Sequence, residues 1–316
     1  MELQFLGTGA GMPSKQRNTS AVLLNLSAEG EGYWLFDCGE ATQHQILHTT
    51  LKPRKISKIF ITHLHGDHIF GLPGLLGSRS FLGGDEPLEL YGPQGIKEWV
   101  EMSLRISKTH LTYELRIHEI EVGIVFETSD FRVTAGSLQH VIPCFGYRIE
   151  QQPLPGKLLM EKIAEAGIPK GPWLKQLKDG KDITLPDGRF VRSRDVTGEP
   201  QPGFTVAIVG DTRYCANAVE LAENADALVH EATFDMETGK LAKEYGHSTI
   251  GDAARTAQEA NAGTLIATHI SARFMSGDLV KLREQGQAIH PKLYIAEDFS
   301  RFEWKQGEVL PVREQG

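Results

Sequence analysis

The stretch Ile59-Phe60-Ile61-Thr62-His63-Leu64-His65-Gly66-Asp67-His68 decides what this chain can be. Its first part is a short apolar run rich in β-branched residues, which predicts a buried strand. Three histidines and an aspartate follow within six residues, and imidazole nitrogens and carboxylate oxygens are ligands that zinc prefers. These four side chains cannot all face one ion, but they can reach two neighbouring ions if the loop curls back. The stretch therefore predicts a two-metal hydrolytic site, and a solvated polar loop is the alternative.

Composition narrows the class of protein without naming an activity. The chain has 316 residues and a formal net charge of −8, which is typical of a soluble globular protein. Its three cysteines, Cys38, Cys144 and Cys215, are widely spaced and form no CxxC pair, so we expect reduced thiols in a reducing compartment. No segment approaches the ~20 apolar residues of a membrane helix, and no secretory leader pattern is present. We expect a cytoplasmic protein with no membrane segment.

Metal-type ligands recur where predicted strands end. A strand at 131–138 precedes His140, a strand at 204–209 precedes Asp211, and a strand at 264–267 precedes His269. Sites in proteins built from sheets and helices form at the carboxyl ends of strands. Strands and helices alternate over residues 1–150 and 203–316, and a final strand is predicted at 292–296. The pattern predicts an α/β fold in which two sheets pack together with helices outside.

Together these residues give a complete ligand set for two ions. The proposed division is His63, His65 and His140 for one ion, Asp67, His68 and His269 for the other, and Asp211 as the bridge. A shared water would fill the remaining position and become the nucleophile near neutral pH. His44 and His48, four residues apart on a predicted helix, are interpreted as an ordinary helix face.

Glu231 and His247 remain outside this ligand set. A carboxylate beside an imidazole can orient it and raise its basicity, so the pair could protonate a leaving oxygen. A purely structural hydrogen bond is the alternative. The early glycine-rich segment 7–13 is not followed by a helix pattern, so it is not a dinucleotide fingerprint, and no organic cofactor is expected.

Residues 151–202 differ in character from the rest of the chain. They are rich in glycine and proline, and between Gly156 and Arg194 nine Lys and Arg stand against five Asp and Glu. A short helix is predicted at 158–166. The charge contrast with an acidic chain favours an inserted, protruding basic arm that binds an anion, and a floppy surface loop is the alternative.

Several motifs together resemble the metallo-β-lactamase superfamily and, within it, the short form of the ribonuclease Z family. The HxHxDH run at 63–68 carries the superfamily resemblance. The family motifs are an early strand motif at 36–40, PxKxRN at 13–18, HEAT at 230–233, HST at 247–249, and the basic insertion. The resemblance covers essentially the whole chain, and no metal-ligand position departs from it.

The resemblance implies a single metallo-β-lactamase-like domain over 1–316. Its fold would be an αβ/βα four-layer sandwich, with the insertion at 151–202 acting as a flexible tRNA-binding exosite. It implies two Zn²⁺ per subunit on the ligand set above, and a homodimer. The implied activity is a zinc-dependent endoribonuclease that removes the 3′ trailer of precursor tRNA just after the discriminator nucleotide. Two-metal hydroxide attack on the phosphodiester would leave a 3′-hydroxyl on the tRNA.

The resemblance also implies roles for particular side chains. Asp67 would handle the proton of the attacking water, and Glu231 with His247 would assist departure of the leaving group. Residues expected to contact substrate are Lys15, Arg17 and Asn18 of the 13–18 loop and Arg273. The resemblance thus implies that the metal site determines the reaction, whereas residues outside it determine which substrate is bound.

Two other readings stay open. One is a different hydrolase of the same superfamily, such as a lactamase, a lactonase, an arylsulfatase-like enzyme or a cyclic-nucleotide phosphodiesterase. Such an enzyme shares the metal site but has no use for a basic arm or a PxKxRN loop. The other is a non-catalytic tRNA-binding protein with a vestigial site, which the complete ligand set argues against.

Overall fold

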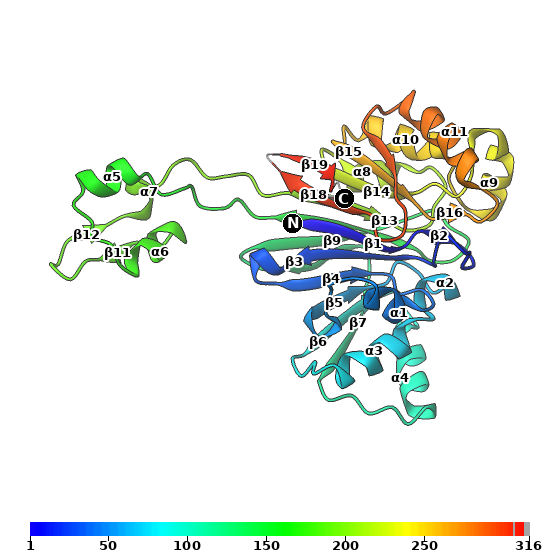
Figure 1. The fold of residues 1–316 in the computed structure, drawn as a ribbon, viewed down its shortest axis with the longest axis horizontal. Coiled ribbons are helices and arrows are strands. Elements are labelled where there is room, and N and C mark those ends of the chain that lie inside the picture. The colour runs from blue at the N-terminus through cyan, green and yellow to red at the C-terminus, as the bar shows by residue number, and fades with distance from the viewer. Residues whose placement is uncertain (306, 313–316) are drawn as a thin grey trace. The chain divides into compact units, whose positions relative to one another are not determined.

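The computed structural model describes residues 1–305 and 307–312 (Figure 1). The chain divides into two compact units. Unit 1 comprises Met1–Phe126, Val133–Ile149 and Thr205–Gly316, and unit 2 comprises Glu127–Arg132 and Glu150–Phe204. Among the described residues no helix combines the length and the apolar character needed to cross a membrane.

An eight-stranded sheet contains the strand that the opening stretch predicts. Its order is β19-β18-β1-β3-β4-β5-β6-β7, and β4 to β7 run parallel. The strands are β1 (Glu2–Gly7), β3 (Ala21–Leu26), β4 (Gly32–Phe36), β5 (Ile56–Phe60), β6 (Leu88–Gly92), β7 (Leu115–Glu119), β18 (Arg301–Lys305) and β19 (Glu308–Pro311). Parallel strands end at the same edge, so their exits can build one site.

A seven-stranded sheet supplies the other strand exits. Its order is β17-β15-β14-β13-β10-β9-β8, with β13, β14, β15 and β17 parallel. The strands are β8 (Gly123–Glu127), β9 (Phe131–Ser137), β10 (Phe145–Gln151), β13 (Thr205–Val209), β14 (Ala227–Glu231), β15 (Thr264–Thr268) and β17 (Leu293–Ile295). A separate pair, β2 (Gly9–Ala10) and β16 (Ile270–Ser271), joins the loops beyond the two sheets.

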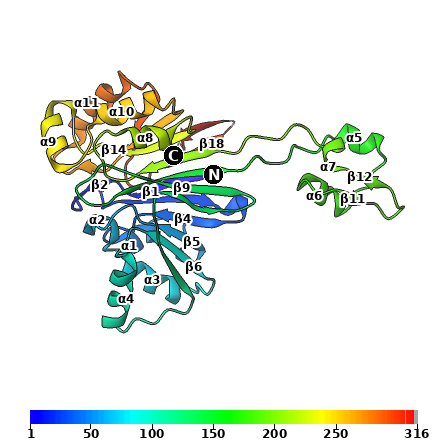
Figure 2. The same cartoon turned by 180° about the vertical axis from the view of Figure 1, so that it is seen from behind.

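Helices cover the outer faces of the two sheets in unit 1 (Figures 1 and 2). On the first sheet they are α1 (Thr42–Leu47), α2 (Gly66–Ile69), α3 (Leu72–Phe81) and α4 (Ile96–Ile106). On the second they are α8 (Ala216–Ala222), α9 (Gly239–Tyr245), α10 (Ile250–Glu259) and α11 (Ser276–Gln287). Short 3₁₀ turns are η1 (Ser27–Glu29), η2 (Pro53–Lys55) and η3 (Met236–Thr238). Thr249 caps α10 in a capping box with Asp252.

Aromatic side chains hold the inner faces of the two sheets together. Phe36 and Phe60, from β4 and β5, lie with ring centroids 5.9 Å and 5.3 Å from that of Tyr147 on β10. The Tyr147 hydroxyl is buried and donates to the carbonyl oxygen of Ile61 at 2.6 Å. Ile61 lies two residues before His63, so the same packing that joins the sheets also fixes the start of the ligand loop.

The C-terminal strands depart from the sequence prediction. The strand predicted at 292–296 is present as β17, but it is not the last, because β18 and β19 follow it. These two strands join the first sheet, and β8 to β10 join the second, so the sheets do not follow the halves 1–150 and 203–316. β18 pairs with β1 at the far end of the chain, a partner that no local pattern specifies.

Unit 2 is a small folded body with a core of its own. It contains α5 (Met160–Glu165), α6 (Trp173–Lys178), α7 (Ser193–Val196) and the hairpin of β11 (Ile183–Thr184) and β12 (Phe190–Val191). α5 matches the helix predicted at 158–166. Its buried apolar residues are Ile163, Ile168, Leu177, Ile183, Leu185 and Val196. All nine Lys and Arg side chains between 156 and 194 are exposed, so the segment is folded and presents its cations to solvent.

The glycine that precedes α3 gives a test of the packing behind the ligand loop. A Cβ on Gly71 would lie 1.9 Å from the carbonyl oxygen of Gly39, whereas a Cβ on Gly77, in α3, meets nothing closer than 3.8 Å. Gly71→Ala is therefore expected to lower the free energy of unfolding by about 1–3 kcal/mol or more. Gly77→Ala, the matched control, should raise it by about 0.5–1 kcal/mol. Urea denaturation followed by circular dichroism measures both, and equal effects would contradict this packing.

Candidate metal centre and active site

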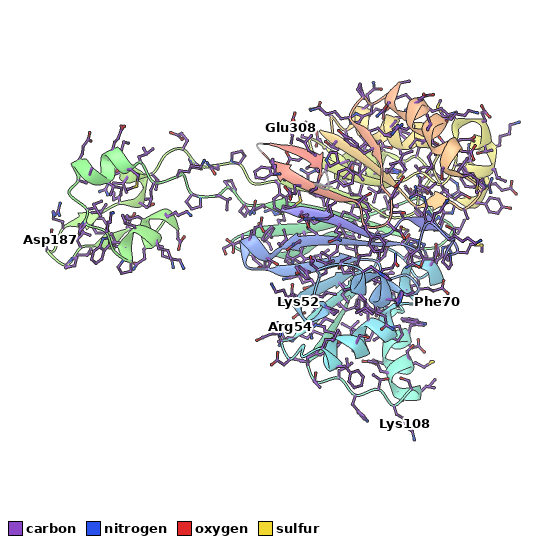
Figure 3. The ribbon with its side chains drawn as sticks, viewed as in Figure 1. Lys52, Arg54, Phe70, Lys108, Asp187 and Glu308 are labelled. Carbon is purple, nitrogen blue, oxygen red and sulfur yellow. The ribbon has the colours of Figure 1, made fainter. Side chains whose placement is uncertain are left out.

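The ligand loop turns sharply where β5 ends. Gly66 begins α2, and a Cβ there would lie 2.3 Å from the ring of Phe70, so a larger residue would displace that ring. The Phe70 side chain is 57% exposed and points outward beside the loop (Figure 3). The turn brings Asp67 and His68 back toward His63 and His65, as the sequence predicts.

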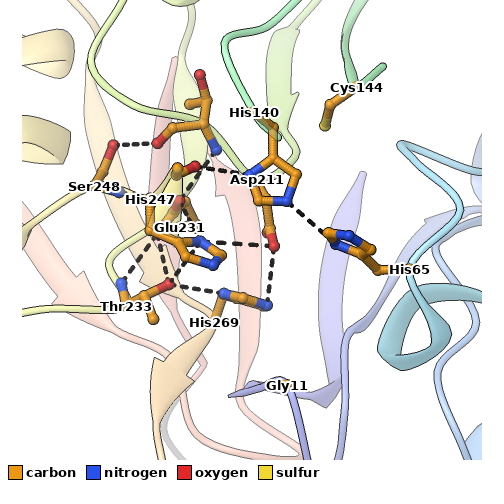
Figure 4. Close-up of polar contacts among 12 residues, drawn as sticks. Gly11, His65, His140, Cys144, Asp211, Glu231, Thr233, His247, Ser248 and His269 are labelled. Carbon is orange, nitrogen blue, oxygen red and sulfur yellow. Dashed lines mark hydrogen bonds and ion pairs between the residues drawn. The ribbon is translucent and has the colours of Figure 1, made fainter. Parts of the chain in front are cut away.

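All seven side chains assigned as ligands from the sequence lie close together in unit 1. His65 Nδ1 is 3.1 Å from His63 Nε2 and 3.2 Å from His140 Nε2. Together these three residues form a group whose ligand atoms all lie within 4.8 Å of one another. His140 follows β9, so it reaches this group from the second sheet (Figure 4).

A second group lies beside the first. His269 Nε2 is 3.3 Å from Asp67 Oδ2 and 3.4 Å from His68 Nε2. Asp211 Oδ2 is 3.7 Å from His63 Nε2, 3.6 Å from His68 Nε2 and 3.3 Å from His269 Nε2. The carboxylate of Asp211 thus touches both groups, which is the division that the ligand count predicts.

The chemistry of this cluster fits divalent cations. His65 Nδ1 faces both His63 Nε2 and His140 Nε2 and can donate to only one of them, whereas a cation can accept a lone pair from all three nitrogens. Three of the histidines and Asp211 are buried, and burial makes an unneutralised carboxylate costly. The residues therefore fit a centre for two metal ions. The role of each individual side chain as a ligand stays a prediction.

Three ligand histidines are held by hydrogen bonds at their other ring nitrogen. His68 Nδ1 donates to Asp37 Oδ2 at 2.7 Å, and His140 Nδ1 donates to the carbonyl oxygen of Gly246 at 2.7 Å. His269 Nδ1 and Thr233 Oγ1 are 2.8 Å apart. Such partners fix the orientation and tautomer of a ligand imidazole.

Asp37, the hydrogen-bond partner of His68, is a candidate site residue that the sequence analysis left without a role. It stands directly after β4, inside the 36–40 motif, and a carboxylate at a strand exit was the available signal. Its backbone φ is 58°, and His269 has a φ of 56°. Left-handed backbone is costly for residues other than glycine and clusters at functional sites. Both residues sit where a strand ends and a side chain must turn into the cluster.

Glu231 and His247 form a hydrogen-bonded pair at the edge of the cluster. His247 Nδ1 is 3.0 Å from Glu231 Oε1 and 3.7 Å from Asp211 Oδ2. The buried Glu231 also accepts from the backbone N–H groups of Thr212, Thr233 and Ser248. Burial acts to lower the pKa of His247, but the Glu231 carboxylate outweighs it, together with Asp211 and Asp67, and raises that pKa to about 9.

His230, one residue before Glu231, is not part of this arrangement. Its side chain is buried, and its Nδ1 donates to the carbonyl oxygen of Glu231 at 2.7 Å. Successive residues of a strand point to opposite faces, so only one of this adjacent pair can face the site. His44 on α1 and His48, its C-terminal cap, are exposed, with ring centroids 4.9 Å apart.

The 13–18 loop lies against the cluster, but its residues are placed differently from one another. The N–H of Gly11, just before the loop, donates to Asp67 Oδ2 at 2.8 Å. Lys15 is exposed, and Asn18 Nδ2 donates to the carbonyl oxygen of Glu40. Arg17 is only 7% exposed, and its guanidinium donates to Thr8 Oγ1 and the carbonyl oxygen of Ala296.

Arg17 therefore fastens the loop to the body of unit 1, which differs from the expectation of a side chain presented to substrate. Arg273 is exposed, and its guanidinium lies 4.8 Å above the ring of Phe234. The centroid of that ring is 6.1 Å from the His247 ring. Arg273 is thus close to the His247 side of the site, and contact of Lys15, Asn18 or Arg273 with substrate stays a prediction.

Two similar proteins show to which family the chain belongs. The chain is 55% identical over 300 residues to ribonuclease Z of Bacillus velezensis, covering 95% of this chain and 97% of that protein. It is 54% identical over 299 residues to ribonuclease Z of Bacillus subtilis, with the same coverage. The chain belongs to the ribonuclease Z family. It is accordingly a hydrolase of the endoribonuclease class, as the sequence motifs predicted.

Solved structures confirm the fold. The human short-form tRNase Z superposes with a TM-score of 0.69 at 32% identity, covering 96% of this chain and 99% of that chain. A metallo-β-lactamase fold protein of Bacillus subtilis, YhfI, superposes with a TM-score of 0.66 at 20% identity, covering 96% and 99%. A family model described as anti-Pycsar protein Apyc1 matches residues 1–154. The α/β sandwich of the metallo-β-lactamase fold is therefore confirmed.

Asp37 provides a test of the metal centre that leaves the ligand set intact. Asp37→Asn removes the charge that faces His68 Nδ1, so the affinity for one metal ion should fall roughly 10–100-fold. Glu40→Gln, an exposed change in the same motif, is the matched control. Competition titration with a chromogenic zinc chelator measures both affinities, and thermal unfolding checks the fold. Unchanged metal affinity in folded Asp37→Asn would refute the assigned role.

Proposed function

We propose that the chain is a zinc-dependent ribonuclease Z that removes the 3′ trailer of precursor tRNA. The cut would fall just after the discriminator nucleotide and leave a 3′-hydroxyl on the tRNA. The observation that carries the proposal is the arrangement around Asp211. Its carboxylate lies within 3.3–3.7 Å of imidazoles from both ligand groups and of His247, so two cations and a proton donor can act on one phosphate.

Zinc suits the proposed ligands, because imidazole nitrogens and carboxylate oxygens in this number satisfy its coordination. When bound, two zinc ions would lower the pKa of a water and offset the charge on the phosphate oxygens. The histidine partners Asp37, Thr233 and Gly246 would keep the ligands oriented while substrate enters and leaves.

The protein's own groups would move the protons. Asp67 would accept a proton from the attacking water, whose oxygen forms a bond to phosphorus. On the opposite side, the bond between phosphorus and the discriminator O3′ breaks, and that oxygen keeps the electron pair. His247 would donate the proton that O3′ needs, since its hydrogen bond to the Glu231 carboxylate favours the protonated ring by raising its pKa. The phosphate then remains on the 5′ end of the trailer.

Unit 2 supports a structured RNA as the substrate. Within it, nine exposed Lys and Arg stand against five Asp and Glu between residues 156 and 194, in a chain whose net charge is −8. Basic side chains hold a fixed array of phosphates without reading sequence. We propose that residues 151–202 act as the tRNA-binding exosite. The proposal includes a homodimer, two zinc ions per subunit, and a cytoplasmic location where precursor tRNA is made.

A precursor tRNA assay separates this function from its rivals. The purified protein should make one defined cut in a 3′-extended precursor tRNA, and mapping of both product ends locates it. Asp67→Ala should abolish the cut while tRNA binding, measured by gel shift, is retained. Asp85→Ala, which removes an exposed carboxylate of unit 1 outside the cluster, is the control. Hydrolysis of a cyclic nucleotide with no cut in the tRNA would favour another hydrolase of the superfamily.

Removal of the exosite tests the choice of substrate. Gly156 lies against the backbone of Gly198, so residues 156–198 can be replaced by a short Gly-Ser linker without stretching the chain. Cleavage of precursor tRNA should fall strongly in this variant, because most of the phosphate contacts are lost. Hydrolysis of bis-(p-nitrophenyl) phosphate, which needs only the metal centre, should be spared. Equal loss of both activities would mean that the segment is structural.

A further inference from the structure

A groove of about 860 Å³ in unit 1 includes His247 of the candidate site in its lining. It lies between α9, α10 and the loop after β13, and all of its lining residues belong to unit 1. Besides His247, the groove is lined by the cations Arg213, Lys243 and Arg255, the carboxylates Asp252 and Glu259, the ring of Tyr214, and the amide side chains of Gln139 and Gln258, together with smaller and apolar residues. The proposed mechanism uses His247 but none of the other residues of this groove.

Two cations in the groove are not neutralised by a carboxylate. Arg255 pairs with Glu259 at 2.8 Å. Arg213 instead donates from Nε to the carbonyl oxygen of Lys243 at 2.6 Å, which anchors its guanidinium against α9. Within residues 1–305 and 307–312 neither Arg213 nor Lys243 forms an ion pair. An anionic ligand would meet both.

Tyr214 gives the groove an aromatic surface with a fixed position. Its hydroxyl donates to Glu259 Oε2 at 2.5 Å, and the Arg255 guanidinium lies 4.2 Å from its ring centroid. A ring held in this way can stack on a nucleobase, and amide side chains nearby can bond to base edges. Cations, a ring and amides together match a nucleotide better than an isolated phosphate.

The position of His247 indicates which nucleotide of the substrate the groove would bind. In an in-line displacement the attacking and leaving oxygens lie on opposite sides of phosphorus. Because His247 is the proton donor to the leaving oxygen in the proposed function, the groove lies on the leaving side. A cut that leaves a 3′-hydroxyl on the tRNA makes that oxygen part of the last tRNA nucleotide. The trailer keeps the phosphate and belongs on the other side.

We propose that this groove binds the tRNA-side nucleotide of the scissile bond, with Lys243 and Arg213 on its 5′ phosphate and Tyr214 against its base. The inference rests on the proposed function and adds the binding site for the nucleotide that departs with the leaving oxygen. Recognition by stacking and charge accepts any of the four bases.

Two lysines on α9 provide a matched pair of variants. Lys243 lines the groove, whereas Lys240, one turn earlier and also exposed, does not. Lys243→Glu should lower kcat/KM on precursor tRNA by roughly tenfold more than it lowers hydrolysis of bis-(p-nitrophenyl) phosphate. Lys240→Glu should change neither rate. If the two variants lower kcat/KM on precursor tRNA equally, general charge repulsion explains the loss, and the proposal is wrong.

Product inhibition assigns the side of the bond. A tRNA ending at its discriminator should inhibit the wild-type protein more strongly than the same tRNA lacking that nucleotide. Lys243→Glu should remove this difference and leave inhibition by a 5′-phosphorylated trailer oligonucleotide unchanged. If the variant weakens only the trailer, the groove holds the other product and the proposal is wrong. Absence of any cut in precursor tRNA by the wild-type protein would instead refute the proposed function.

Discussion

The buried carboxylate of Asp211 is the constraint on which the site depends. Four imidazole nitrogens lie within 3.3–3.7 Å of its Oδ2 atom, from His63, His68, His247 and His269. A group so enclosed cannot be left without positive charge, and nearby imidazoles cannot all be protonated without repelling one another. Metal ions bound here would resolve this conflict, because they supply charge and accept the imidazole lone pairs. The fold must therefore hold several strand exits rigidly at one point.

That rigidity comes from the packing of two sheets. Tyr147 links the aromatic layer between the sheets to the backbone at Ile61, two residues from His63. Asp37, Thr233 and Gly246 then orient individual rings through short hydrogen bonds. Ligands from the first sheet and ligands from the second meet only because the inner faces are fixed against each other. The chemistry at the metals and the stability of the core are thus parts of one arrangement.

Sequence reasoning predicted which histidines and aspartates lie together, because their signal is local and chemically specific. His63, His65, Asp67 and His68 lie within six residues, and His140, Asp211 and His269 each follow a recognisable strand. What it missed was non-local. The partner of β18 is β1, nearly the whole chain away, and Asp37 gains its role only from contact with His68. The burial of Arg17 depends on Thr8 and Ala296, so its motif alone could not show that it faces inward.

The pairing of β18 with β1 has a consequence for folding during synthesis. β1 is made first, but it lies between β3 and a strand formed by Arg301–Lys305. Asp298, from the same late segment, accepts hydrogen bonds from Thr8 and from the backbone of Asn18. A chain still on the ribosome therefore lacks an edge of its first sheet, an anchor of its 13–18 loop and, until late, His269. A partly translated copy that has not reached residues 269–305 therefore lacks part of the histidine and aspartate cluster and of the sheet that positions it.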